Sequence, residues 1–311
     1  MCLKKRLNQL GRSKKPFFCL ISFDKMSVVS DYLSNIPETI KYEFDFSSFS
    51  HHNIKLKHQK INKNLYKDMF QKVQQNIKAG NTYLLNLTAV SKLNTKLSLD
   101  EIYQASNSSF KLLFKDKFVS FSPEKFITIQ DDMIYTYPMK GTIDFAIKDA
   151  KNRLLLDKKE LAEHTMVVDL LRHDIGQFAS NVKVDRFRYI DKLTTTNKTI
   201  LQTSSKISGL LKTNSMNNIG DILEYMLPAG SITGAPKIST NRLINSIEQH
   251  PRGFFTGIFG VFDGSSFRSF VLIRYIFKDK DSLYYHSGGG ITSDSIVDDE
   301  FDELNDKIYL V

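Results

Sequence analysis

Cysteine is scarce in this sequence, and its scarcity excludes two classes of protein. The only cysteines, Cys2 and Cys19, both stand near the N-terminus. They are too few for a disulfide framework, and their spacing is not that of a zinc site. We therefore expect the fold to be held by its hydrophobic core.

Long apolar runs are also lacking. The run at 17–23 ends at Asp24 and Lys25 and is followed by no cleavage site of a secretory signal. No segment approaches the roughly 20 apolar residues that a membrane-spanning helix needs. We therefore expect a cytoplasmic protein that has no membrane partner.

The sequence carries more positive than negative charge. Its 43 Lys and Arg residues against 34 Asp and Glu residues give a formal net charge of +9. Such an excess attracts anions of any kind, but the motifs by which proteins read nucleic acids are missing. We expect no nucleic-acid partner, and the charge alone identifies no function.

The order of strand-like and helix-like segments predicts an α+β fold. Short apolar runs at 111–114, 118–121, 126–129 and 133–137 predict an antiparallel meander. Further strands are expected at 17–23, 40–46, 82–90, 200–208, 257–263, 267–277 and 282–286, and helices at 65–77, 154–178, 217–227, 236–248 and 298–310. A regular βαβ alternation is missing, which favours α+β over a doubly wound sheet. Residues 1–60, which end in a His- and Lys-rich stretch at 51–60, are too few for an independent domain.

A pair of glutamates in the predicted helix 154–178 is the first candidate for chemistry. Glu160 and Glu163 are three residues apart, so their side chains project from nearly the same face. That face continues into apolar residues, and a carboxylate buried there needs a compensating charge. A hard divalent cation is one such charge. The alternative is a surface position where Lys158 or Lys159 pairs with the glutamates.

A second pair repeats this spacing in the predicted helix 298–310. Glu300 and Glu303 are again three residues apart, so four carboxylates could frame one Mg²⁺, which prefers oxygen ligands. The alternative is that these residues only complement the positive end of the helix dipole.

Two glycine-rich segments could bind an anion. In the segment 228–237, Thr233 can cap a helix whose first turn contains Pro236, so that free backbone N–H groups point at a ligand. In the segment 287–291, Gly288, Gly289 and Gly290 let the backbone approach a ligand closely. Either segment could equally be a simple tight turn.

Lys140 follows a predicted strand in the string PMKGT at 138–142. A lysine between proline and glycine is ordinarily a solvated turn residue. If it is desolvated, its pKa falls and its amine becomes a nucleophile or a base.

Together and in this order, these segments resemble the chorismate-binding enzyme family. The resemblance covers roughly residues 62–311. It implies a layered fold of mostly antiparallel sheets with helices packed outside and a central catalytic cleft. It further implies a shortened N-terminal segment, 1–60, that packs on a catalytic domain, 61–311. The matching strings are NTYLLNLT (81–88), SPE (122–124), PMKGT (138–142), KELAEHTMVVDLLRHD (159–174), GSITGAPK (230–237), RGFFTG (252–257), GGGI (288–291) and EFDELNDK (300–307).

The resemblance implies a role for each matching residue. The four glutamates would bind Mg²⁺, which would hold the ring carboxylate of chorismate. Glu124 would be the general acid that protonates the departing C4 hydroxyl, and Lys140 would attack C2. Arg274 would grip the enolpyruvyl carboxylate. The other implied substrate-binding residues are Thr142, His164, Thr233, Gly288, Gly289 and Gly290.

Within the family, the PMKGT string resembles that of the members that form aminodeoxychorismate, whereas anthranilate-forming members have alanine in place of Lys140. The isochorismate-forming members carry a lysine that activates water at the position matching Leu84, so ammonia is the better supported nucleophile here. The resemblance thus implies amination of chorismate to 4-amino-4-deoxychorismate, on the way to p-aminobenzoate and folate.

The nitrogen source is expected to be separate. Cys2 and Cys19 lie outside the matching strings, so a glutamine amidotransferase subunit or free ammonia would supply the nitrogen. Two alternatives stay open. His164 matches the anthranilate-type version of its helix, which leaves anthranilate synthase component I, and a non-catalytic subunit that binds chorismate or scaffolds the amidotransferase is the other.

Overall fold

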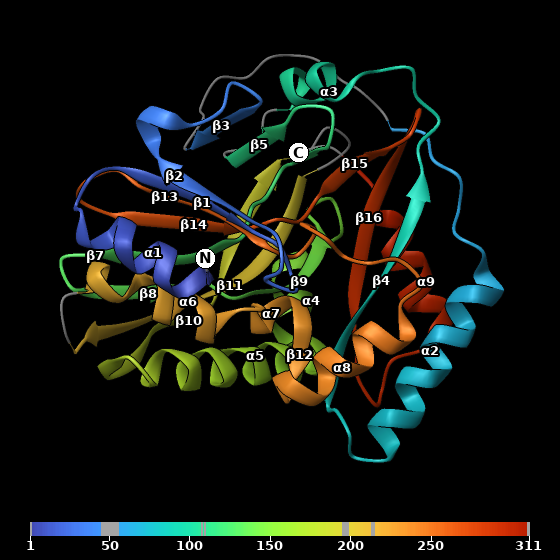
Figure 1. Cartoon of the computed structure of the whole chain (residues 1–311). Helices are drawn as coiled ribbons and strands as arrows, with labels where there is room; N and C mark the ends of the chain where they lie inside the picture. Colours follow the sequence, from blue (N-terminus) through green and yellow to red (C-terminus); the bar gives the residue numbers. More distant parts are fainter. Residues whose placement is uncertain are drawn as a thin grey trace.

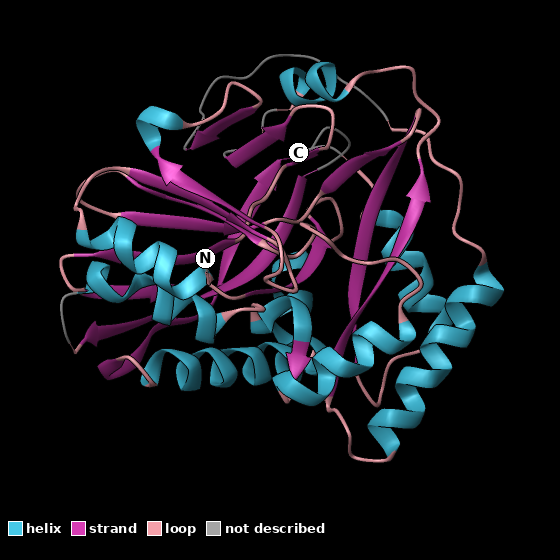
Figure 2. Cartoon of the chain, in the orientation of Figure 1, coloured by secondary structure: helices cyan, strands magenta, loops and turns pink. Residues whose placement is uncertain are grey.

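Two antiparallel sheets and the helices around them make up the fold (Figures 1 and 2). The computed structural model describes residues 2–44, 56–106, 108, 110–194, 199–212 and 215–309. Within these residues every pairing between named strands is antiparallel, and strands and helices alternate without a βαβ pattern. The prediction of an α+β fold is therefore confirmed.

The larger sheet has nine strands. Eight of them follow one path, and the ninth, β9 (Met139–Asp144), pairs with β11 beside β8. In spatial order the eight are β10 (Ala179–Thr194), β11 (Thr199–Leu211), β8 (Met133–Thr136), β7 (Lys125–Gln130), β14 (Phe267–Val271), β13 (Ile258–Phe262), β1 (Phe17–Ile21) and β2 (Val28–Tyr32).

The smaller sheet has seven strands, which include the N-terminal strand β3. In spatial order they are β12 (Gly234–Ala235), β4 (Leu84–Lys92), β16 (Ser282–Ile291), β15 (Tyr275–Asp279), β6 (Phe118–Ser120), β5 (Phe110–Phe114) and β3 (Ile40–Phe44). Residues 1–44 thus contribute strands to both sheets.

Helices cover the sheets on separate sides (Figure 1). The long helix α5 (Lys158–Gly176) packs against β9, β10 and β11, with the short α4 (Ala150–Leu156) before it. The helix α2 (Lys63–Lys78) packs against β4, α8 (Lys237–Ile247) and α9 (Val297–Asp306). The remaining helices are α1 (Leu3–Arg12), α3 (Leu99–Ala105), α6 (Ile219–Met226), α7 (Gly230–Thr233) and two 3₁₀ turns, Leu33–Asn35 and Ser215–Asn218.

The strand β1 shows how the hydrophobic core holds the two sheets together. All five of its residues, FFCLI, are buried, as are all five residues of its neighbour β13. A strand that is apolar on both faces needs cover on both faces. Phe17 and Phe18 accordingly belong to two different hydrophobic clusters, one on each side of the strand.

Two short segments join the sheets, and both carry a predicted site residue. Residues 121–124 link β6 to β7 and include Glu124, and residues 272–274 link β14 to β15 and include Arg274. The segments are hydrogen-bonded to each other, because the Phe121 amide donates to the Arg274 carbonyl at 3.2 Å and the Val271 amide donates to the Glu124 carbonyl at 3.1 Å. Glu124 and Arg274 are thereby brought together at the junction of the sheets.

These junctions correct two sequence-based predictions. The expected strand 267–277 is in fact β14 and β15, which lie in different sheets. The expected meander of four strands is likewise two hairpins, β5 with β6 and β7 with β8, in different sheets. Apolar periodicity marks strands but does not tell which sheet a strand joins.

Helix boundaries differ from the predictions for local reasons. The predicted helix 154–178 is two helices, because Asp157 has an extended backbone and its carboxylate caps α5 by accepting from the Glu160 amide at 2.9 Å.

Two further segments differ from the sequence-based expectations. Gly288, Gly289 and Gly290 lie inside β16, opposite β4, and not in a turn. The basic N-terminus forms the unpredicted helix α1, which buries Leu3, Leu7 and Leu10.

Parts of three predicted segments lie outside the described residues: 45 and 46 of the strand 40–46, 51–55 of the His- and Lys-rich stretch, and 310 of the last helix. Across the described part of the chain, every helix is either too short or too polar to span a bilayer.

Candidate active site

A cavity between the two sheets and α5 collects most of the predicted site residues. It is lined by Glu124, Lys140, Thr142, Glu160, Glu163, Arg274, Gly288, Gly289, Gly290 and Glu303. These residues come from β9, α5, β16, α9 and the two segments that join the sheets. Segments that are distant in the sequence thus converge on one place, as expected for a site rather than for separate surface features.

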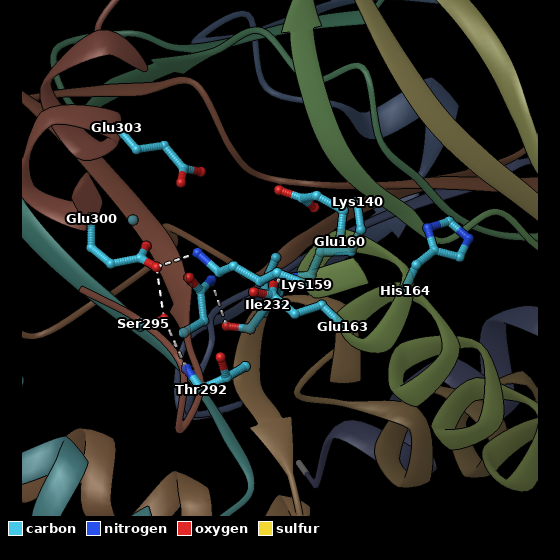
Figure 3. A network of polar contacts seen from close by, with 12 residues as sticks. Lys140, Lys159, Glu160, Glu163, His164, Ile232, Thr292, Ser295, Glu300 and Glu303 are labelled. Atoms are coloured by element: carbon cyan, nitrogen blue, oxygen red, sulfur yellow. Dashed lines mark hydrogen bonds and ion pairs between the residues drawn. The ribbon is translucent and has the colours of Figure 1, made fainter. Parts of the chain in front are cut away.

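Glu160, Glu163, Glu300 and Glu303, here called the carboxylate cluster, come from α5 and α9. Figure 3 shows Glu300 and Glu303 on one side and Glu160 and Glu163 on the other. Glu163 and Glu300 are buried, Glu160 is partly buried, and Glu303 lies exposed at the edge. The two helices therefore do bring their glutamates to one region.

Three lysines balance the carboxylate cluster. Lys159 Nζ lies 2.6 Å from Glu300 Oε1, which also accepts from Ser295 Oγ at 2.7 Å. Lys140 Nζ lies 3.4 Å from Glu163 Oε2, and Lys307 Nζ lies 2.7 Å from Glu303 Oε1. Lys159 therefore pairs with a glutamate of the other helix, and not with its own neighbours at the surface as the alternative interpretation supposed.

The charges in the cluster shift its pKa values in opposite directions. Burial and the negative charge of Glu163 raise the pKa of Glu160 to about 7. The Lys307 ammonium, with smaller effects from Lys159 and Lys140, lowers the pKa of Glu303 to about 2. Near neutral pH, Glu160 therefore exchanges a proton readily, whereas Glu303 stays ionised.

Lys140 points into the cavity and not into bulk water, since only 14% of its side chain is exposed. The pairing of β9 with β11 is irregular between Gln202 and Thr203, next to Lys140, and the Thr203 hydroxyl donates to the Lys140 carbonyl. Such irregularities re-aim a side chain at functional sites.

The protonation of Lys140 differs from the sequence-based expectation. Burial lowers the pKa of its ammonium group, but the negative charges of Glu163, Glu160 and Glu303 more than offset this. The pKa of Lys140 therefore lies above its ordinary value. The expectation from desolvation alone was wrong because it left out the neighbouring carboxylates.

Glu124 is buried, and no lysine of the described residues lies at hydrogen-bonding distance from it. Its Oε1 accepts a 2.5 Å hydrogen bond from the Ser231 hydroxyl, and its amide donates to Ser122 Oγ at 3.1 Å. Burial raises the pKa of the Glu124 carboxyl, although Ser231, Lys140 and Arg274 each act to lower it. A carboxyl with a raised pKa is suited to donate a proton.

Two buried donors beside the cavity lack partners. Within the described residues, Arg274 Nε and Ser287 Oγ make no hydrogen bond, while the other end of the Arg274 guanidinium donates to the Tyr309 hydroxyl at 2.7 Å. Buried donors are rarely left unpaired in folded proteins. An acceptor of a bound ligand would satisfy both.

Gly290 and Gly141 are glycines because the site is crowded. A Cβ on Gly290 would lie 2.9 Å from both Glu163 Oε2 and Lys140 Nζ, and a Cβ on Gly141 would lie 2.8 Å from Glu160 Oε2. Gly141 also has a φ of +76°. Both glycines therefore leave room for side chains of the site, and the close approach of Gly288, Gly289 and Gly290 to a ligand stays a prediction.

Three predicted site residues do not line the cavity. Glu300 lies behind Lys159. Thr233 is fully buried in α7, where its hydroxyl donates to the Ala229 carbonyl, and it does not cap α8, whose N-cap is Pro236. His164 is fully buried on the far side of Lys140 (Figure 3), where its Nε2 lies 2.6 Å from Ser205 Oγ.

His164 is neutral at physiological pH because of this position. Burial, together with the charges of Arg188 and Lys140, lowers its pKa to about 4. It touches the strand that carries Lys140 rather than the cavity, so it supports that strand from behind.

The donor set of the carboxylate cluster suits a hard cation, since it offers only carboxylate oxygens and the members repel one another. Yet no three acidic, histidine or cysteine side chains in the described part of the chain converge where a metal ion could be held. Lysines now pair with Glu163, Glu300 and Glu303. Binding of Mg²⁺ would require the lysines to release them.

The sequence did not single out several residues that line the cavity. They are Asn86, Gln202, Ser231, His286 and Lys307. Two of them had a signal: Ser231 lies within the matching string at 230–237, and Lys307 follows Glu303 by four residues, the spacing of a helical ion pair.

Comparison with known proteins identifies the family. The family described as "chorismate binding enzyme" matches residues 22–311. This chain belongs to the chorismate-binding enzyme family. It is an enzyme that uses chorismate, and the resemblance drawn from the strings is confirmed.

Proteins similar to this chain include members of the chorismate-binding family that are named for different reactions. An "Uncharacterized PabA-like protein" of Haemophilus influenzae is 43% identical, over 97% of this chain and 94% of that protein. Aminodeoxychorismate synthase component 1 of Salmonella typhimurium is 29% identical over 78% of this chain, and the match spans 56% of that protein. Among solved structures, anthranilate synthase component I of Streptococcus pneumoniae has a TM-score of 0.67 at 24% identity, over 86% of this chain and 60% of that one. The solved structure supports the shared fold.

Proposed function

We propose that this enzyme aminates chorismate at C4 with ammonia and releases 4-amino-4-deoxychorismate. The observation that carries the proposal is the position of Lys140. Its Nζ lies 3.4 Å from Glu163 Oε2, and Lys140 and Glu124 line the same cavity. A primary amine there can add to the substrate ring and later be displaced. The relative named aminodeoxychorismate synthase component 1 also supports this choice.

Substrate binding uses the unpaired donors. Chorismate carries two carboxylates, and Arg274 Nε and Ser287 Oγ are buried donors without a partner in the described residues. The planar guanidinium suits a carboxylate. A divalent cation held by the carboxylate cluster would bind the second carboxylate of chorismate, and its charge would oppose protonation of Lys140.

The chemical steps then fall to two side chains. Glu124 gives its proton to the departing C4 hydroxyl, which leaves as water, while neutral Lys140 forms a bond to C2. Ammonia next bonds to C4, and the C2–nitrogen bond breaks with its electron pair returning to the Lys140 amine. Two allylic displacements thus give net substitution of hydroxyl by amine at C4.

The nitrogen is proposed to come from a glutamine amidotransferase partner or from free ammonia. The described cysteines do not offer a glutaminase site: Cys19 is buried, and burial raises the pKa of its thiol to about 12, while Cys2 is exposed and does not line the cavity.

One experiment tests the function. Purified protein is incubated with chorismate, Mg²⁺ and an ammonium salt, and the products are resolved with and without added aminodeoxychorismate lyase. We expect p-aminobenzoate only when lyase is present. Anthranilate formed directly would contradict the proposal and support the anthranilate synthase alternative, and no product at all would support a non-catalytic subunit.

The same assay tests Lys140. Lys140→Ala should lower the rate of amination at least about 1,000-fold, the range expected for a covalent nucleophile. Lys125→Ala, which removes an exposed lysine of β7, is the matched control and should keep full activity. An active Lys140→Ala enzyme would exclude the covalent route.

A further inference from the structure

The contact between Glu124 and Ser231 is unusual among the carboxylates of the cavity. Glu124 Oε1 accepts from the Ser231 hydroxyl at 2.5 Å, and in the described residues its side chain makes no other hydrogen bond. Every cluster member except Glu160 instead has a lysine within 3.4 Å. One oxygen of Glu124 is therefore committed to a hydroxyl, and the other is left for the cavity that Glu124 lines.

Ser231 is held in place by its neighbours in α7. The carbonyl of Ile232 accepts from Asn86 Nδ2 at 3.1 Å and from an Arg252 guanidinium nitrogen at 2.9 Å. Gly230 packs so closely on α5 that a Cβ there would lie 2.5 Å from a Leu170 methyl group. The hydroxyl thus sits on a fixed platform between β4 and α5.

Arg252 makes this platform rigid. It is buried and forms a bidentate ion pair with Glu248, in which its Nε and one terminal nitrogen donate to the two carboxylate oxygens at 2.9 Å and 2.8 Å. The Glu248 carboxylate also accepts a hydrogen bond from the Thr88 amide. A buried pair of this geometry resists displacement because breaking it leaves an uncompensated charge.

A carboxylic acid has its proton on one oxygen only. Because Oε1 accepts a hydrogen bond from the Ser231 hydroxyl, the proton that Glu124 can transfer belongs on Oε2. The charged groups that face Glu124 are Lys140 of β9 and Arg274 of the 272–274 segment. Arg274 is a cation and only donates, and the neutral Lys140 of the proposed step uses its lone pair to bond to C2, so neither is left to accept that proton.

We propose that Ser231 is the positioning residue of the proton donor: by donating to Oε1 it fixes the Glu124 carboxyl and directs the acidic proton on Oε2 toward the departing hydroxyl. The proposal deepens the proposed function, since it rests on Glu124 being the acid. In the step, the C4–oxygen bond breaks with its electrons on oxygen, the Oε2 proton moves to that oxygen to complete water, and Glu124 remains as a carboxylate.

The hydroxyl also sets the pH range of the acid. A hydrogen bond donated to a carboxyl favours its ionised form, so Ser231 lowers the pKa that burial has raised. Activity that needs protonated Glu124 falls as pH rises through this pKa. Removing the donor must therefore move the basic limb of the pH profile to higher pH.

The test is the pH profile of kcat/KM for chorismate consumption with saturating ammonium salt. Ser231→Ala should lower kcat about tenfold, a part of the 10²- to 10⁴-fold that acid catalysis supplies, and should move the basic limb upward. Ser231→Thr keeps a hydroxyl and should restore both values. Ser246→Ala, an exposed serine of α8, is the control and should match the parent protein.

Two results would overturn the inference. One is a Ser231→Ala enzyme that loses rate while its basic limb stays in place, because a merely structural serine would behave this way. The other is a Ser231→Thr enzyme that stays as impaired as the alanine variant although its thermal midpoint equals that of the parent.

Failure of the proposed function would look different. If the product is anthranilate but the limb moves as expected, only the function is wrong, because loss of the C4 hydroxyl is still assisted by the acid. If aminodeoxychorismate is formed but the limb does not move, only the inference about Ser231 is wrong.

Discussion

Glu124 and the carboxylate cluster share one cavity but are stabilised in opposite ways. Glu163, Glu300 and Glu303 each have a lysine within 3.4 Å, and the pKa of Glu303 falls to about 2. Among the described residues, the side chain of Glu124 hydrogen-bonds to the Ser231 hydroxyl alone, and burial raises its pKa. The same residue type is therefore held as an anion at Glu303 and is suited to donate a proton at Glu124, and the surroundings decide which.

The largest effect that would sharpen this comparison is expected at Glu124. Glu124→Gln keeps the shape of the side chain but removes the proton, so kcat should fall about 10²- to 10³-fold. Steady-state kinetics with chorismate and ammonium salt measure it. Glu38→Gln, an exposed glutamate, is the control. A Glu124→Gln enzyme with near-normal kcat would break the comparison, because Glu124 would then act as another anion or not at all.

A smaller effect is expected when the cluster loses one anion. Glu163→Gln should raise the Mg²⁺ concentration needed for half-maximal activity about 10- to 100-fold, since one oxygen donor with full charge is lost. Titration of activity with Mg²⁺ measures this shift. Glu124→Gln is the counterpart and should leave the Mg²⁺ requirement of its residual activity unchanged. If the Mg²⁺ concentration for half-maximal activity rose equally in both variants, Glu124 and Glu163 would not have different roles in Mg²⁺ binding.

The smallest effect concerns the one cluster member without a lysine partner. Because the pKa of Glu160 rises from 4.5 to about 7, the folded protein holds this proton more tightly than the unfolded chain. Stability must therefore fall as pH rises from about 4.5 to about 7 and then level off. Glu160→Gln removes this penalty and should stabilise the metal-free protein by about 1 to 3 kcal/mol at pH 8.

Chemical denaturation in the presence of a chelator, at pH 4 and pH 8, checks the sign. At pH 4 the variant and the parent should have the same free energy of unfolding, because Glu160 is protonated in both states. A gain at pH 4 that equals the gain at pH 8 would mean that the substitution acts through packing and not through charge.

Local spacing explains what the sequence predicted well. Residues three apart on a helix share a face, which is why Glu160 with Glu163, and Glu300 with Glu303, each reach the same region. Periodicity also located most strands and so the α+β class. These signals need no knowledge of the rest of the chain.

Long-range pairing explains what was missed. Lys159 bonds to Glu300, 141 residues away, and no local pattern marks that contact. The pKa of Lys140 is raised by the negative charges of three carboxylates on two helices. The residues next to Lys140 in the sequence do not include these carboxylates, so the sequence predicted the wrong direction of the pKa shift. His164 stands one residue from Glu163, yet the turn of the helix carries its ring behind β9.

The helix α1 shows a signal that charge concealed. Leu3, Leu7 and Leu10 follow helical spacing and are buried, but this spacing was not recognised among the basic residues of the N-terminus, and no helix was predicted there. Lys4 and Arg6 instead form ion pairs with Asp221 and Asp31.

The place of β1 has a consequence for biosynthesis. β1 pairs with β13 in the larger sheet, where Phe17 lies opposite Phe262. During synthesis, the apolar residues of β1 therefore lack this neighbour until β13 has also been translated. Contacts of such long sequence separation slow folding and prolong the exposure of apolar segments.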